Sequence, residues 1–280
     1  MVGHYYPSSL EETLIELKKN RYQIIAGGTD VLVQYRSWSE TVPKVKYPLM
    51  FIHHLSELKF MTENVDYIEI GACVTYKDLL SSPLIPKVLK DTIIEIASPG
   101  IRHTATLGGN IANASPAADA VCTLIALDAM VVIKSIDSIR TEKIEDFITG
   151  VKKTSLKPDE IIYSVKIPNV MSDYACFYKV GGRQADAISK VSLAAVMNAT
   201  DGRITKWRMA FGAVGPKVMT SLSIDGMMIG KTIEEIKITI PAILEQYSPL
   251  INPIDDQRST AKYRKLVAMN LIQKFIDAIS

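Results

Sequence analysis

The chain has 280 residues, of which 48% are hydrophobic and 22% charged, and its formal net charge is +2. This length predicts two compact units or three small ones, and the balance of apolar and charged residues excludes a long disordered chain. A net charge this close to zero argues against the clustered basic surface that nucleic-acid-binding proteins use, so no nucleic-acid partner is expected.

Cysteine and histidine are too sparse to indicate a metal centre. The three cysteines, Cys73, Cys122 and Cys176, lie far apart in the sequence. Such a set argues against a disulfide framework and against an iron–sulfur cluster held by this chain alone, which would need about four thiolates. The adjacent pair His53-His54 is a poor metal site because neighbouring side chains point apart. We therefore expect no metal ligands.

No segment indicates secretion or a membrane span. The first residues, MVGHYYPSSLEET, lack a basic stretch followed by an apolar run, and no run approaches the roughly 18 consecutive apolar residues of a membrane helix. We therefore expect a cytoplasmic protein without membrane contact.

The first part of the chain predicts a small helix–strand–loop–strand unit. Ser8 and Ser9 before two glutamates form a capping-box pattern, after which leucines recur on one helical face. Short apolar runs at residues 22–26 and 49–52 predict buried strands. The unit is expected to end near residue 55.

The rest of the chain predicts a mixed α+β protein. Strands are expected at residues 66–74, 130–134 and 160–167, helices at 84–97 and 117–127, and a loop at 146–150. From about residue 174 three strand candidates at hairpin-like spacing precede amphipathic helices at 233–245 and 260–279, with an Asp201-Gly202 turn between the last two strands. This change of pattern places a second boundary near residue 170, which gives units at 1–55, 56–170 and 171–280.

Two glycine pairs stand out, one in AGGTD at residues 26–30 and one in TLGGN at residues 106–110. Glycine permits a positive φ and close approach of a ligand to the backbone, and successive amides in such a turn can form an anion-binding nest. Thr29, Thr106 and Asn110 add polar groups, and Asp119 can accept a hydrogen bond from a sugar hydroxyl. Two nests and a carboxylate would suit a ligand with a diphosphate and a ribose.

A glycine pair by itself more often marks a simple turn. The run TLGGNIANASPAADA, however, is poor in large side chains, and a packed core would need more volume there. Other nucleotide or nucleophile motifs are missing, since the sequence has no G-x-G-x-x-G after a strand, no complete P-loop and no G-x-S-x-G.

These two segments resemble the flavin-binding signatures of the FAD-binding subunit of molybdenum hydroxylases, the family of xanthine, carbon monoxide and nicotinate dehydrogenases. DFITG at residues 146–150, DEIIYSVKIP at 159–168 and FYKVGGRQADAISKVSLAA at 177–195 follow the family's pattern and order, so the resemblance covers nearly the whole chain. It implies a vanillyl-alcohol-oxidase-type FAD-binding module of two α/β subdomains, followed by a small C-terminal α+β domain.

The resemblance also implies a set of FAD contacts. The first loop would wrap the diphosphate with Ile24, Ile25, Ala26, Gly27, Gly28, Thr29, Asp30 and Val31, and the second would cradle phosphate and ribityl with Thr106, Leu107, Gly108, Gly109 and Asn110. Asp119 would contact the cofactor further along, and Ile96 and Ile162 would lie against its rings. Lys179 would reach the pyrimidine edge of the flavin and raise its reduction potential. From the residues alone, Ile96 and Ile162 could equally be core, and Lys179 a solvated strand lysine.

The implied function is electron transfer, without a catalytic side chain of this chain's own. Electrons from a large molybdopterin-binding subunit would pass through a small [2Fe-2S] subunit to FAD on this chain, and then to NAD or another acceptor. Two alternatives remain open: a self-contained flavin-dependent reductase of the same fold, and a non-catalytic scaffold subunit.

Overall fold

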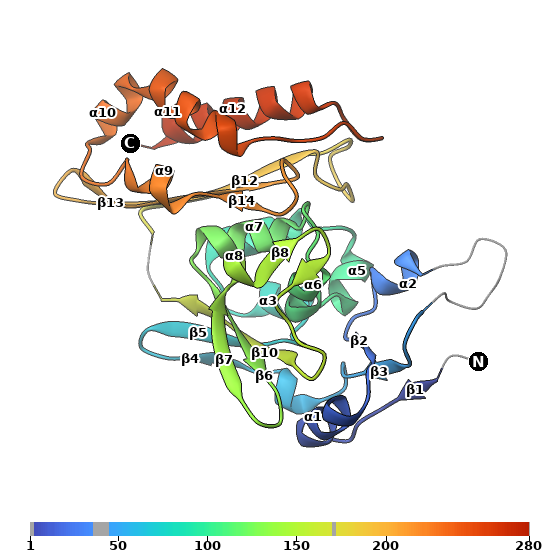
Figure 1. The fold of residues 1–280 in the computed structure, drawn as a ribbon. Helices are drawn as coiled ribbons and strands as arrows, with labels where there is room; N and C mark the ends of the chain where they lie inside the picture. Colours follow the sequence, from blue (N-terminus) through green and yellow to red (C-terminus); the bar gives the residue numbers. More distant parts are fainter. Residues whose placement is uncertain (1–2, 36–44, 170–171, 280) are drawn as a thin grey trace.

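The computed structural model describes residues 3–35, 45–169 and 172–279. The described chain forms three sheet-based units with helices packed against them, which confirms the α+β prediction (Figure 1). The predicted boundary at residue 170 lies outside the described residues.

The N-terminal unit is a three-stranded parallel sheet covered by one amphipathic helix. Helix α1 (Leu10–Lys19) begins at Ser9, whose side chain accepts from the Glu12 amide, and its leucines are buried as predicted. The sheet order is β1 (His4–Tyr5), β3 (Leu49–Phe51), β2 (Gln23–Ile25). A short helix that was not predicted, α2 (Val31–Gln34), follows the first glycine pair, and a 3₁₀ turn (Ser56–Leu58) ends the unit.

The middle unit is built on a five-stranded antiparallel sheet. Its strands, in sheet order, are β4 (Met61–Glu63), β5 (Tyr67–Gly71), β10 (Ile161–Pro168), β6 (Met130–Lys134) and β7 (Ile139–Lys143). Its helices are α3 (Tyr76–Ser81), α4 (Lys87–Ile94), α5 (Pro99–Thr104), α6 (Leu107–Asn113), α7 (Asp119–Ala126) and α8 (Ile144–Phe147), and β8 (Ile148–Gly150) pairs with β9 (Lys153–Thr154).

The C-terminal unit is a four-stranded antiparallel sheet of β11 (Tyr174–Val180), β12 (Val191–Thr200), β13 (Arg203–Gly212) and β14 (Met219–Thr220). Its helices are α9 (Leu222–Gly226), α10 (Ile233–Ile238), α11 (Ile240–Tyr247) and α12 (Ala261–Ala278), with a 3₁₀ turn at Ser248–Leu250.

Strand β12 is buried on both faces, which explains its continuous run of small apolar residues. Leu193 and Ala195 belong to the core under the C-terminal helices, whereas Ala194 and Val196 belong to the core that contains α7. Because side chains alternate along a strand, one apolar run serves both cores. The sheet therefore lies between α12 and α7, and the C-terminal unit covers the middle unit (Figure 1).

Four local predictions were wrong. Residues 107–113, predicted as a glycine-rich loop, form helix α6, and residues 144–150, predicted as a loop at 146–150, contain α8 and β8. Helix α4 ends at Ile94, well before residue 97, and the helix predicted at 233–245 is interrupted at Thr239. In the first case the threonine cap and two buried side chains outweigh the low helix propensity of glycine.

Candidate functional site

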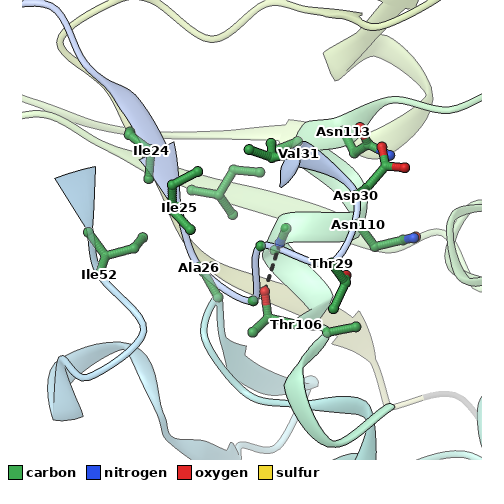
Figure 2. A pocket seen from close by; sticks show the side chains of 18 of the residues that line it. Ile24, Ile25, Ala26, Thr29, Asp30, Val31, Ile52, Thr106, Asn110 and Asn113 are labelled. Atoms are coloured by element: carbon green, nitrogen blue, oxygen red, sulfur yellow. Dashed lines mark hydrogen bonds between the residues drawn. The ribbon is translucent and has the colours of Figure 1, made fainter. Parts of the chain in front are cut away.

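A cavity of about 330 Å³ lies where the N-terminal and middle units meet. The first glycine loop, helix α6 and the start of β10 all contribute to its lining. Figure 2 shows residues of the first glycine loop beside Thr106 and Asn110. The two glycine pairs, far apart in the sequence, thus face one space, as expected for a shared ligand. Of the predicted site residues, those that line the cavity are Ile24, Ile25, Ala26, Gly27, Gly28, Thr29, Asp30, Val31, Thr106, Gly108, Gly109, Asn110 and Ile162.

The first glycine loop needs glycine at both positions, for two different reasons. Gly28 has φ +68°, a conformation that side chains resist. A Cβ at Gly27 would lie 2.2 Å from the Thr104 carbonyl oxygen, so the loop packs backbone to backbone on the end of α5. Within the described residues, the backbone amides from Gly27 to Asp30 have no protein acceptor. They remain able to donate to an anionic ligand.

The second glycine pair offers a different surface from the predicted nest. Thr106 caps α6 by accepting from the Gly109 amide at 3.1 Å, and the amides of Leu107 and Gly108 donate to Val74 and Ala72 (Figure 2). These amides are therefore not free, and the prediction of an amide nest here was wrong. The backbone of α6 is helical, so Gly109 needs no positive φ.

Asn110 is the polar group of α6 that a ligand would satisfy. Its side-chain oxygen is buried and has no hydrogen-bond partner in the described chain, and the residue lines the cavity. An orphaned buried acceptor costs about 1–3 kcal/mol, so such a group usually has a partner. Asn110 thus marks where a ligand with a hydrogen-bond donor would bind.

At one end of the cavity lies a polar cluster that the sequence did not reveal. Lys152, in the turn between β8 and β9, donates to Asp30 at 3.0 Å and to Asn113 at 2.6 Å. Gln34 donates to the same two acceptors. Burial alone would raise the pKa of Asp30, but Lys152 and the amides outweigh it and hold that pKa below its usual value. Asp30 is therefore ionised, and Figure 2 shows it beside Asn113.

Four predicted site residues lie outside this lining. Leu107 is fully buried in the core, and Ile96 packs against the same core. Asp119 and Lys179 form a buried ion pair at 2.9 Å, with side chains 6% and 7% exposed. Ser189 donates to Asp119, and Lys179 also donates to the carbonyl oxygen of Glu95. The sequence did not indicate that these two residues would pair.

Lys179 lines a second hollow of about 370 Å³, formed by Glu95 and the chain that follows β11. Arg102, near the end of α5, donates hydrogen bonds to the carbonyl oxygens of Ile94, Ile96 and Ala97. The turn that carries Ile96 is thus held from two sides by cations.

The described residues offer neither a metal centre nor a membrane-spanning helix. They contain no group of three or more His, Cys, Asp or Glu side chains placed to hold a metal ion. No helix in these parts of the chain is long and apolar enough to cross a lipid bilayer.

The geometry suits an anionic cofactor, because a cavity lies between two glycine-bearing segments and one of them has backbone amides without acceptors in the described chain. Residues 1–170 match the family described as the FAD binding domain in molybdopterin dehydrogenase, and residues 176–279 match the CO dehydrogenase flavoprotein C-terminal domain.

Relatives and solved structures agree. The chain is 29% identical to the nicotinate dehydrogenase FAD-subunit of Eubacterium barkeri, covering 98% of this chain and 95% of that one. It is 32% identical to the putative xanthine dehydrogenase FAD-binding subunit of Escherichia coli K12, covering 69% and 67%. Quinoline 2-oxidoreductase from Pseudomonas putida 86 superposes with a TM-score of 0.85 at 25% identity, covering 99% and 95%. Carbon monoxide dehydrogenase from Hydrogenophaga pseudoflava shares the fold, with a TM-score of 0.88 at 23% identity and coverage of 99% and 96%.

The chain therefore belongs to the family of FAD-binding domains of molybdopterin dehydrogenases. It is an oxidoreductase flavoprotein subunit of the molybdenum hydroxylase type, and its cofactor is FAD. The site fits that cofactor. The first-loop amides that lack acceptors in the described chain suit a diphosphate, and the Asn110 oxygen has no partner there. A Cβ at Gly109 would lie 4.0 Å from the Cβ of Ala26 and so take up space between α6 and the first loop.

Proposed function

We propose that FAD binds between the first glycine loop and α6 and that this chain transfers electrons within a molybdenum hydroxylase complex. Electrons would arrive from iron–sulfur clusters of a partner subunit and leave to NAD or another acceptor. The observation that supports this binding site is that one cavity is lined both by Asn110, whose buried side-chain oxygen has no partner in the described chain, and by loop residues whose amides also lack acceptors there. A bound flavin supplies the chemistry, since it can exchange electrons singly or as a hydride, and the protein supplies position and electrostatics.

The cysteines support a need for partner subunits. Cys73 and Cys122 are buried and Cys176 is half-buried. Burial raises the pKa of the Cys73 and Cys122 thiols to about 12 and that of Cys176 to about 11, so none is a ready thiolate ligand. Relatives carry names such as the nicotine 6-hydroxylase medium subunit of Paenarthrobacter nicotinovorans. We propose a large molybdopterin-binding subunit and a small [2Fe-2S] subunit as the partners.

We further propose that the flavin ring extends from the cavity toward Ile96 and Lys179. In this arrangement residues 1–55 and 56–170 hold the nucleotide part, and residues 171–280 supply Lys179. The Asp119–Lys179 pair supports this placement because it is a buried charge pair between the middle and C-terminal units, beside a hollow. Ile162 would then contact the cofactor from the back of the cavity.

Lys179→Met is expected to lower the reduction potential of the bound flavin by roughly 30 mV, which is about 1.4 kcal/mol for a two-electron couple. The substitution removes a cation and leaves the Asp119 carboxylate unbalanced, and both changes disfavour negative charge on a reduced ring. A redox titration followed by visible absorption measures the potential. Lys166→Met, which removes the same charge from a lysine above the Tyr67 ring, is the control. An unchanged reduction potential in Lys179→Met would show that the flavin ring does not lie near Lys179.

The function is tested by purifying the full chain with whatever subunits accompany it. We expect a yellow complex that releases FAD on denaturation and that contains iron and molybdenum in its other subunits. Its flavin should be reoxidised by NAD or by another acceptor after chemical reduction. A colourless chain that FAD cannot reconstitute would reject the proposal in favour of a scaffold role. A yellow chain that turns over substrate with no partner would favour the self-contained reductase.

A further inference from the structure

We propose that Lys152 is a positioning residue: it neutralises Asp30 and ties the first glycine loop to helix α6, and so slows FAD release. This inference rests on the proposed binding of FAD in the cavity. Among the described residues that line the cavity, Lys152 is the one cation and Asp30 the one carboxylate.

The backbone fixes Lys152 at this place. The residue occupies a tight turn with φ 56°, a conformation that is uncommon outside glycine. Its amide donates to the carbonyl of Ala114, the C-cap residue just after α6, at 3.0 Å. The turn is therefore attached to the end of α6, and the side chain projects from there to the first loop.

The side chain joins two parts of the chain that meet at the cavity. Asp30 and Gln34 come from the first loop and α2, whereas Asn113 is the last residue of α6. Lys152 and Gln34 both donate to Asp30 and to Asn113, so the two parts share acceptors. At its other end the loop is held by Gly27 against the backbone of Thr104. The segment with the free amides, Gly28 and Thr29, is thus fixed at both sides.

Charge explains why this tie matters for a flavin nucleotide. An ionised carboxylate in the wall of a diphosphate site repels the ligand unless a cation balances it. Lys152 supplies this balance while it engages Asp30 directly. The pair is about half exposed, with side chains 41% and 50% accessible, so its contribution to the stability of the whole fold is small. Its effect should therefore appear in cofactor retention.

Lys152→Met in the full chain is expected to release FAD about tenfold faster, measured as the rise of flavin fluorescence after dilution, while the melting temperature of the FAD-free protein stays close to wild type. Lys153→Met, at the next residue in the chain and outside the cavity lining, should release FAD at the wild-type rate. Lys152→Arg should retain most of the slow release because it keeps the charge.

The pairing with Asp30 is tested by the double variant Asp30→Asn/Lys152→Met. If Lys152 acts through Asp30, neutralising the carboxylate makes the cation unnecessary, and the double variant should release FAD more slowly than Lys152→Met alone. A double variant that releases FAD as fast as Lys152→Met would show that Lys152 does not slow release by neutralising Asp30, and would overturn the inference. Equal release from wild type and Lys152→Met would also overturn it, but would leave FAD binding intact. A wild-type chain that binds no FAD would reject the proposed function itself.

Discussion

Gly109→Val is expected to abolish FAD retention, with affinity reduced at least about 100-fold, while most secondary structure persists. A Cβ at this position would lie 2.8 Å from the hydroxyl oxygen of Thr106, the residue that caps α6, and 4.0 Å from the Cβ of Ala26 across the cavity. The two further methyl groups of valine would displace the cap and fill the space between α6 and the first loop. The visible absorption spectrum of the purified chain measures bound flavin, and far-ultraviolet circular dichroism measures the fold.

Gly100→Val is the matched control for this substitution. Gly100 also lies in a short helix, α5, but a Cβ there meets nothing within 4 Å. The Gly100→Val variant should therefore bind FAD as the wild type does. Gly109→Ala should be intermediate, because it adds the Cβ without the branches. Normal flavin content in Gly109→Val would show that FAD does not lie against α6.

Arg208→Met is expected to destabilise the fold more than any other substitution proposed above. It should lower the free energy of unfolding by about 3–5 kcal/mol, or the melting temperature by on the order of 10 °C. Arg208 lies on β13, is 4% exposed, and joins the C-terminal sheet to the middle unit. It contacts Asp128 at 2.8 Å, Glu145 at 2.7 Å and Asp225 at 3.1 Å. Methionine would leave three carboxylates without their shared cation in a largely buried place.

Arg203→Met on the same strand is the control for Arg208. Arg203 is exposed and donates to the Gly230 carbonyl at 2.8 Å, so its loss should lower the melting temperature only slightly. Thermal unfolding followed by circular dichroism compares the two variants. A melting temperature for Arg208→Met equal to that of Arg203→Met would mean that the buried cluster does not hold the units together.

Much of the secondary structure could be predicted because it follows from local patterns. The leucine spacing of α1 and the Asp201-Gly202 turn between β12 and β13 are read directly from neighbouring residues. Helix α6 could not be predicted in this way. Its glycines, alanine and asparagines favour a loop, and it forms because Thr106 caps it and because Leu107 and Ile111 are fully buried.

The candidate site could be predicted in part, because glycine pairs are also local features of the sequence. Both glycine pairs were identified, and they line one cavity. The role of Lys152 could not be predicted, since it has the same chemistry as the neighbouring Lys153 and only the turn that carries it sets its direction. The pairing of Asp119 with Lys179 was likewise invisible, because these residues belong to different units.

The sequence by itself determined which segments can approach a ligand closely and which strands and helices are buried, because glycine sterics and side-chain periodicity act over a few neighbouring residues. Only the tertiary structure decided which amides remain free, which charges pair, and that Gly109 is required for space and Gly28 for its dihedral angle. These properties depend on atoms that packing brings together from distant parts of the chain, and no local pattern of residue types encodes their final positions.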